Sequence, residues 1–178
     1  MKRFFCCLFA IVAIFTFTSE GREKPNILFV LFDDMGYGEP TSYRPTSLFK
    51  TPNIDRMAKE GMRFTDAHSS AASCTPTRYG FLTGRYPHRI GQFGVLSTFS
   101  PPLIPDTRLT IASYLKRNGY TTACIGKWHL GMNWDRPKTK GKNKTKEKLK
   151  IGEKMTGGPN AIGFEYFYGF THARNFQS

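Results

Sequence analysis

The stretch that decides the fold reads Ser73-Cys74-Thr75-Pro76-Thr77-Arg78-Tyr79-Gly80-Phe81-Leu82-Thr83-Gly84. Pro76 suits the first turn of a helix, because its missing N–H would have no intrahelical partner there. Residues 77–82 can continue that helix, and Gly84 can end it. Cys74 is then expected just before a helix N-terminus, where free N–H groups and the helix dipole favour an anion. Arg78, about one turn further on, can reach back to Cys74 with its fork of donors.

The spacing Cys-x-Pro-x-Arg, followed after four intervening residues by Thr-Gly, resembles the signature of the sulfatase family. The resemblance implies that Cys74 is oxidised to formylglycine, whose hydrated aldehyde attacks the sulfur of a sulfate ester. It also implies that Arg78 orients this nucleophile. The alternative interpretation, a buried structural cysteine beside a surface arginine, would suit an isolated cysteine better than the full string.

Two adjacent carboxylates follow a continuous apolar run at residues 26–32 and precede Met-Gly-Tyr-Gly. Unpaired carboxylates are costly to bury, so Asp33 and Asp34 need a cation or hydrogen-bond donors. Neighbours in a strand point to opposite faces, so the backbone must turn if both are to reach one ion. Oxygen ligands suit Ca²⁺ or Mg²⁺. The sulfatase resemblance implies a calcium or magnesium site formed by Asp33, Asp34 and residue 74; a loop with solvated charges is the alternative.

Residues 126–131 read Gly-Lys-Trp-His-Leu-Gly, which matches a third sulfatase landmark in full. Lys127 and His129 are two residues apart, so an extended backbone would point them the same way. Lys127 can supply a fixed positive charge, and His129 can move a proton near neutral pH. The resemblance implies that Lys127 screens the sulfate and that His129 is a catalytic base.

The remaining pattern predicts an α/β fold with a mostly parallel central sheet flanked by helices. Apolar runs at residues 26–32, 62–67 and 120–126 are typical of strands, and the aromatic residues 164–170 of a strand or turn. Residues 52–60 and 109–118 are typical of helices. Alternating strands and helices favour parallel pairing, and chemistry gathers at the carboxyl ends of such strands. The resemblance implies an alkaline phosphatase-like sulfatase fold, incomplete at the C-terminus.

The N-terminal 21 residues have the layout of a secretory signal peptide. Lys2 and Arg3 precede an apolar run at residues 4–18, and Ser19-Glu20-Gly21 offers a cleavage site. We therefore expect an exported protein, periplasmic or secreted (lysosomal or extracellular in a eukaryote), without a stable membrane span; an uncleaved anchor is the alternative. The mature part, residues 22–178, keeps two cysteines, of which Cys124 reads as a small core residue.

The net charge of +13 is concentrated in one segment. Residues 136–154 hold nine basic and two acidic residues and almost no apolar ones, which is typical of a solvated loop or insertion. Attraction of a polyanionic substrate is a second interpretation. Because no aromatic residues interleave with these lysines, we expect no nucleic-acid partner.

The sulfatase resemblance covers residues 24–174, and sulfatases are much longer. Their second half supplies another pair of metal ligands, a lysine and a histidine that this chain does not show. The serine that many sulfatases place near the sulfate corresponds here to Ala173, between His172 and Arg174. We therefore interpret residues 22–178 as the N-terminal part of a catalytic domain, and expect this part alone to be inactive.

The sequence thus predicts hydrolysis of sulfate esters on sulfated small molecules or glycans, with formylglycine and Ca²⁺ (or Mg²⁺) as cofactors. A formylglycine-generating or anaerobic sulfatase-maturating enzyme is the implied modifying partner. Three alternatives stay open: a phosphodiesterase or phosphonate hydrolase of the same superfamily, a non-catalytic secreted protein that binds polyanions, and a truncated product without function.

Overall fold

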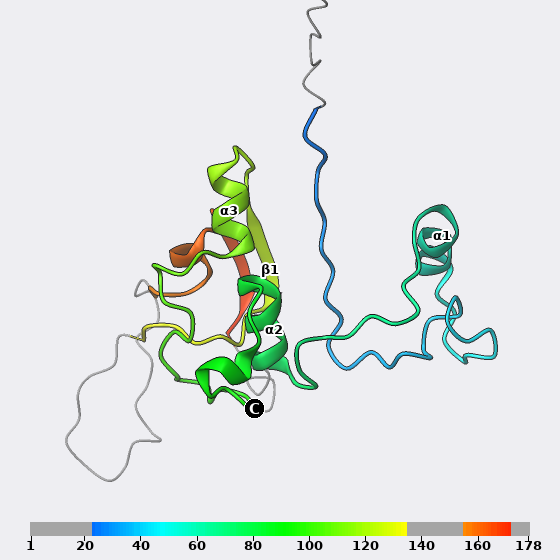
Figure 1. Cartoon of the computed structure of the whole chain (residues 1–178), viewed down its shortest axis with the longest axis horizontal. Helices are drawn as coiled ribbons and strands as arrows, with labels where there is room; N and C mark the ends of the chain where they lie inside the picture. Colours follow the sequence, from blue (N-terminus) through cyan, green and yellow to red (C-terminus); the bar gives the residue numbers. More distant parts are fainter. Residues whose placement is uncertain (1–22, 135–154, 172–178) are drawn as a thin grey trace, which may run out of the picture. The chain divides into compact units, whose positions relative to one another are not determined.

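The computed structural model describes residues 23–134 and 155–171 of the 178-residue chain. The chain divides into two units, residues 1–35 and residues 36–178. The described part of the first unit, residues 23–35, is an extended segment that ends in a bend at Asp33 and Asp34. The second unit holds all the helices and strands of the described residues (Figure 1).

Two of the predicted strands are wrong. Residues 26–32 form no strand, and the side chains from Ile27 to Phe32 are 39–87% exposed. An apolar extended segment becomes a strand only when a neighbouring strand completes its hydrogen-bond ladder. Within residues 23–35 there is no such partner for residues 26–32. Residues 62–67 are likewise irregular, with Met62 and Phe64 exposed.

The predicted helices are present. Helix α1 (Pro52–Glu60) begins after Thr51 and ends at Gly61, although none of its residues is buried. Helix α2 (Cys74–Thr83) begins two residues before Pro76 and ends at Gly84, whose φ of 62° is the left-handed value that favours glycine. Helix α3 (Ile111–Arg117) begins with a reciprocal capping box between Thr110 and Ser113.

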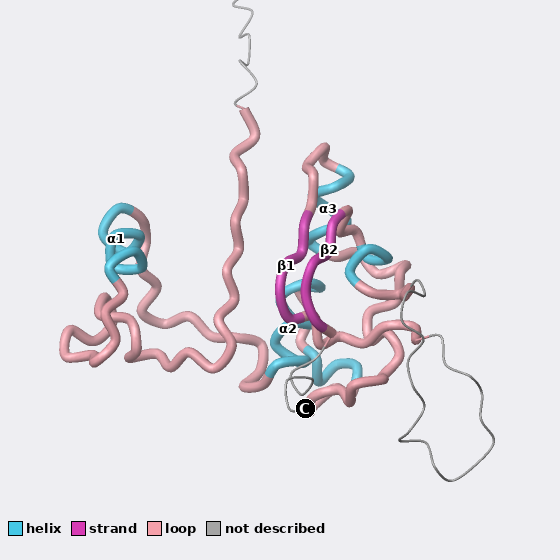
Figure 2. The backbone as a smooth tube through the Cα atoms, turned by 180° about the vertical axis from the view of Figure 1, so that it is seen from behind, coloured by secondary structure: helices cyan, strands magenta, loops and turns pink. Residues whose placement is uncertain are grey.

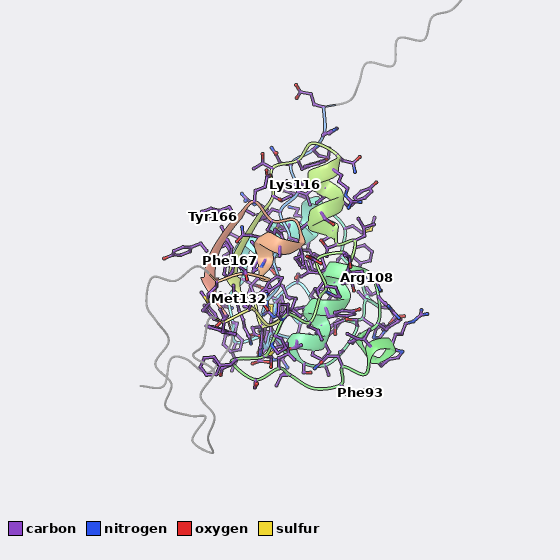
Figure 3. The ribbon with its side chains drawn as sticks, turned by 90° about the vertical axis from the view of Figure 1, so that its left-hand side faces the viewer. Phe93, Arg108, Lys116, Met132, Tyr166 and Phe167 are labelled. Atoms are coloured by element: carbon purple, nitrogen blue, oxygen red, sulfur yellow. The ribbon has the colours of Figure 1, made fainter. Side chains whose placement is uncertain are left out.

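The sheet of the described residues has two parallel strands, β1 (Ala123–Lys127) and β2 (Tyr166–Phe170). The register pairs Ala123 with Tyr166 and Lys127 with Phe170. Figure 2 shows the strands side by side, and the views from opposite sides place α2 and α3 on the same face of the sheet. On β2, Phe167 packs against the core whereas Tyr166 is exposed (Figure 3). Tyr168 is exposed as well. The prediction of an α/β fold with parallel strands is confirmed.

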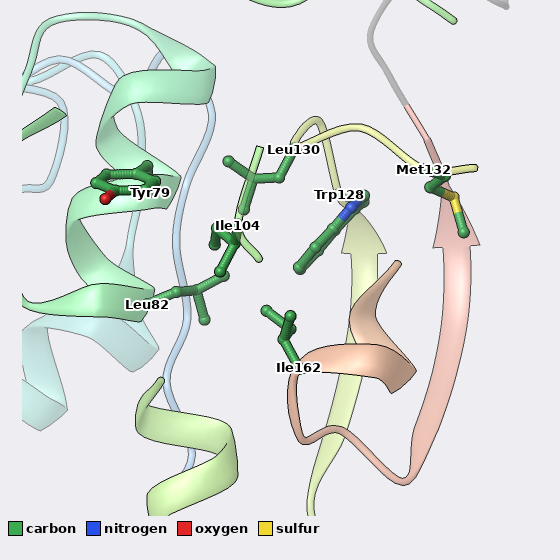
Figure 4. Packing of buried hydrophobic residues seen from close by; sticks show 7 residues of the cluster. All are labelled: Tyr79, Leu82, Ile104, Trp128, Leu130, Met132 and Ile162. Atoms are coloured by element: carbon green, nitrogen blue, oxygen red, sulfur yellow. The ribbon is translucent and has the colours of Figure 1, made fainter. Parts of the chain in front are cut away.

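The hydrophobic core lies between α2 and the ends of the strands (Figure 4). Its buried members come from α2, from residues 128–132 after β1, from the loop at 104 and from the short helix η2 (Pro159–Ile162): Tyr79, Leu82, Ile104, Trp128, Leu130, Met132 and Ile162. A second short helix, η1 (Pro87–Ile90), follows α2. The segment after β1 is therefore anchored by its own apolar side chains, which fixes the position of the polar residues between them.

Candidate functional site

Cys74 is the first residue of α2, preceded by Ser73 in extended conformation. The first turn of a helix presents N–H groups without intrahelical partners, and the dipole adds positive potential there. Pro76 lies in this turn, as predicted, and is buried. The side chain of residue 74 is therefore held where negative charge is stabilised.

Lys127, at the end of β1, contacts Cys74, and Arg78 of α2 contacts Lys127. The Nζ of Lys127 donates a hydrogen bond to the Sγ of Cys74 across 3.1 Å. The Nη1 of Arg78 donates to the backbone oxygen of Lys127 across 2.5 Å. Arg78 therefore fixes the backbone that carries Lys127, while Lys127 directs its charge to residue 74. The structure brings these three predicted site residues together.

His129 is joined to the same helix through the residue after the cysteine. The hydroxyl of Thr75 donates to the backbone oxygen of His129 across 2.8 Å and accepts from the N–H of Leu96 across 3.1 Å. The Nε2 of His129 lies 3.0 Å from the backbone oxygen of Leu96. His129 is buried, at 5% exposure, and Thr75 is fully buried. The fourth predicted catalytic residue is thus tied to the N-terminus of α2.

The backbone of His129 is not extended, contrary to the expectation behind the Lys127–His129 spacing. The N–H groups of Trp128 and His129 still bond to Phe170 and Thr171, so the pairing continues past β1. At His129, however, φ is 54°, a value uncommon outside glycine. The turn sends the Lys127 side chain to Cys74 and the His129 ring to Leu96.

Asp33 and Asp34 belong to the first unit. Asp34 has a φ of 63°, so the backbone turns within the pair, as two carboxylates on one ion would require. Among the described residues, Asp34 and His129 are the two non-glycine residues with positive φ. Such conformations cluster at functional sites. Within residues 23–134 and 155–171, no three His, Cys, Asp or Glu side chains are grouped to hold a metal ion.

Cys74 and Cys124 are not joined by a disulfide. Burial raises the pKa of the Cys124 thiol, and the nearby charge of Arg78 lowers it by a smaller amount. Cys124 packs against the hydrophobic core from β1, in agreement with the predicted core role. A disulfide between the two would consume the sulfur that Lys127 contacts.

Other predicted features fall outside the site or outside the described residues. His68 is exposed beside Asp66, and His88 stacks on Tyr86. The signal sequence at 1–21, the basic segment at 136–154 and the residues His172, Ala173 and Arg174 lie outside the described residues. No helix of the described residues has the length and apolar character to cross a membrane.

Sequence reasoning missed Thr75 and Leu96. Thr75 stands at a variable position of the Cys-x-Pro-x-Arg pattern, and its one signal was a hydroxyl in the first turn of a predicted helix, where such groups bond to nearby backbone. Leu96 acts through its N–H and its carbonyl oxygen. Every residue except proline carries both groups, so no residue type could have marked this position.

Comparisons with known proteins establish the family of the chain. The family model described as Sulfatase matches residues 25–178. The chain is 42% identical over 113 residues to N-acetylgalactosamine-6-O-sulfatase of Bacteroides thetaiotaomicron, which is 64% of this chain and 22% of that protein. It is 45% identical over 121 residues to human steryl-sulfatase, which is 65% of this chain and 21% of that protein. The chain therefore spans about a fifth of the length of these relatives.

Solved structures share the fold. A Bacteroides thetaiotaomicron structure, from work on the metabolism of multiple glycosaminoglycans, superposes with a TM-score of 0.70 at 35% identity, over 85% of this chain and 29% of that one. The crystal structure of Ps i-CgsB superposes with a TM-score of 0.61 at 34% identity, over 79% of this chain and 27% of that one. With a family match from residue 25 to residue 178 and these likenesses in structure, the chain belongs to the sulfatase family.

Proposed function

We propose that residues 22–178 form the N-terminal part of a catalytic domain that hydrolyses sulfate esters, with residue 74 as nucleophile. One observation carries the proposal: Lys127 Nζ lies 3.1 Å from Cys74 Sγ at the N-terminus of α2. A helix N-terminus and an ammonium group directed at one side chain together favour an anionic substrate. A cysteine with a purely structural role would need neither.

The fit of formylglycine to residue 74 can be judged from this contact. Sulfur is a weak hydrogen-bond acceptor, and an oxygen bound to the same carbon would accept more strongly from Lys127. In this proposal Cys74 Sγ stands in for an oxygen of the converted side chain. When present, formylglycine supplies a hydrated aldehyde oxygen as the nucleophile toward sulfur.

The protein's own side chains would then take distinct roles. Lys127 would hold positive charge beside residue 74 and a bound sulfate oxygen, which is where charge develops during the reaction. Arg78 would keep the Lys127 backbone in place through its bond to the Lys127 oxygen. His129, whose neutral imidazole has one nitrogen that can take a proton, would accept a proton during release of sulfate.

Asp33 and Asp34 would hold the metal ion. Their donor chemistry fits, because carboxylate oxygens are suitable ligands for Ca²⁺ and also for Mg²⁺. The left-handed backbone of Asp34 supports a shared ion, because it breaks the alternation that would separate the two side chains. A bound divalent ion would neutralise sulfate charge and lower the pKa of an attacking hydroxyl.

The substrate class, partners and location follow the same proposal. The relatives named above include an N-acetylgalactosamine-6-O-sulfatase and a steryl-sulfatase, so we propose a sulfated glycan or small molecule as the substrate. A formylglycine-generating or anaerobic sulfatase-maturating enzyme would convert Cys74. Residues 1–21 would direct export, to the periplasm or outside the cell, or to the lysosome in a eukaryote.

The deciding experiment compares an aryl sulfate with the matching aryl phosphate. The protein at its natural length is produced with a formylglycine-generating enzyme, supplied with Ca²⁺, and assayed beside a Cys74→Ala variant. Turnover of the sulfate that Cys74→Ala abolishes would support the proposal. Preference for the phosphate would favour a phosphodiesterase or phosphonate hydrolase. Heparin binding that survives Cys74→Ala, without turnover of either ester, would favour a polyanion-binding protein.

A further inference from the structure

Three residues far apart in the sequence close a hydrogen-bonded ring that we call the 75–96–129 ring. Thr75 Oγ1 donates to the backbone oxygen of His129, and the N–H of Leu96 donates to Thr75 Oγ1. The Leu96 carbonyl oxygen lies 3.0 Å from His129 Nε2. Thr75 and His129 are buried, so water does not compete strongly for these groups.

The ring determines where the imidazole carries its proton. A carbonyl oxygen can only accept a hydrogen bond, so the Nε2 of His129 must be the donor in its contact with Leu96. In a neutral imidazole the other nitrogen, Nδ1, then has the lone pair that can take a proton. The Leu96 carbonyl selects this tautomer only while it keeps its position. Thr75 holds that position, because its hydroxyl accepts a hydrogen bond from the N–H of Leu96.

The same hydroxyl supports an unusual backbone. His129 has a φ of 54°, and Thr75 Oγ1 donates to the carbonyl oxygen of that residue across 2.8 Å. Left-handed non-glycine residues persist when their surroundings fix them from several sides. Thr75 therefore acts on both the ring and the backbone of His129, and it does so from the position next to Cys74.

We propose that Thr75 is a positioning residue, which fixes His129 in the Nε2-protonated tautomer so that Nδ1 is its proton-accepting nitrogen. The inference rests on the proposed function for the use of that proton, and on the 75–96–129 ring for its geometry. Thr75 does not itself need to touch the substrate.

The first test measures the tautomer directly in the 178-residue chain. ¹⁵N-labelled histidine is followed by NMR, with His129 assigned through a His129→Gln variant. We expect the wild type to carry its imidazole proton on Nε2 and to protect the Leu96 amide from hydrogen exchange. Thr75→Val, which keeps the shape but removes the hydroxyl, should populate the Nδ1-protonated form and speed exchange at Leu96.

Two variants serve as matched controls. Thr75→Ser keeps the hydroxyl and should retain the wild-type tautomer. Thr83→Val makes the same substitution in the same helix, at a hydroxyl that bonds to its own helix at Tyr79, and should leave His129 unchanged. A wild-type proton on Nδ1, or an unchanged tautomer in folded Thr75→Val, would overturn the inference. If Thr75→Val does not fold, the wild-type tautomer and Leu96 exchange decide.

Kinetics separate this inference from the proposed function. In the natural-length enzyme, Thr75→Val should lower kcat for an aryl sulfate about tenfold with KM little changed, since a misplaced group costs rate and not ground-state binding. Thr75→Ser should restore kcat. Wild-type turnover with no loss in Thr75→Val overturns the inference alone. Absence of wild-type turnover, with the tautomer as expected, overturns the proposed function and still supports positioning by Thr75.

Discussion

Lys127 and Cys74 are 53 positions apart, yet Lys127 donates from Nζ to the cysteine sulfur across 3.1 Å. Helix α2 begins at Cys74, and strand β1 ends at Lys127. The contact therefore joins a helix N-terminus to the carboxyl end of a parallel strand, where ligand sites of α/β proteins are usually found.

Conversion of Cys74 is the first prediction. Expressed with a formylglycine-generating enzyme, the chain should show an aldehyde in place of the thiol at residue 74, because the Cys-x-Pro-x-Arg string is intact. Mass spectrometry of the tryptic peptide spanning residues 64–78 measures the change. The peptide spanning residues 118–127 holds Cys124 and is the internal control, which should keep its thiol. An unmodified Cys74 under these conditions would count strongly against the proposed hydrolysis of sulfate esters by a formylglycine nucleophile.

The second prediction concerns the charge beside residue 74. Lys127→Ala should lower kcat for an aryl sulfate about 10²-fold or more in the natural-length enzyme, since one preorganised charged group commonly contributes this much. Lys116→Ala is the matched control. Lys116 is half-exposed and lies 3.7 Å from Glu165 at the surface, so its loss should leave kcat unchanged. Near-normal kcat in Lys127→Ala would remove Lys127 from the mechanism.

The sequence predicted α2 well because the signals of that helix are local. Pro76 in the first turn and Gly84 at the left-handed end depend on the backbone of those residues alone. The proximity of Lys127 to Cys74 is a tertiary contact. Only the family resemblance pointed to it, since no spacing rule relates residues 53 positions apart.

The predictions that were wrong concern structure that depends on residues elsewhere in the chain. Residues 26–32 have the composition of a strand, but a strand is defined by pairing, which depends on a partner elsewhere in the chain. The extended alternation expected from Lys127 to His129 was broken by the left-handed backbone at His129. Leu96 escaped notice because it bonds through backbone groups that every residue type except proline carries, and Thr75 because its hydroxyl bonds to residues far along the chain.

The third prediction concerns alkaline pH. Burial raises the pKa of Cys124 above its ordinary value of 9.0, so the unfolded thiol loses its proton at lower pH than the folded one. The stability linked to this group is fully present below pH 9 and is lost as pH rises through the folded pKa. The loss is at most about 1.4 kcal/mol per pH unit, because one proton is involved.

Urea denaturation at several pH values from 8 to about 10.5 measures this slope. The difference between the wild type and Cys124→Ala isolates the thiol from the lysines and tyrosines that titrate in the same range. The difference in unfolding free energy should stay constant up to about pH 9 and shrink above it. A constant difference over the whole range would show that the Cys124 thiol titrates alike in the folded and unfolded chain.

The last prediction concerns Gly131, which ends the segment that carries Lys127 and His129. Its φ is 77°, and a Cβ placed on it would lie 2.0 Å from the backbone oxygen of Pro101. Its own oxygen accepts from the indole of buried Trp128 across 2.8 Å. Gly131→Ala would therefore combine left-handed strain with a collision against backbone that cannot rotate away. We expect a loss of unfolding free energy of at least about 2 kcal/mol.

Gly84→Ala separates the two causes. Gly84 has a similar φ of 62°, but nothing lies within 4 Å of a Cβ placed there. Gly84→Ala should therefore lose only the unfolding free energy that the left-handed strain costs, about 1 kcal/mol. Urea denaturation followed by tryptophan fluorescence measures both variants. The collision should also displace Trp128 and so the residues on either side of it, Lys127 and His129. Equal losses in the two variants would mean that the loop at Pro101 yields, and that close packing at Gly131 does not hold the site in place.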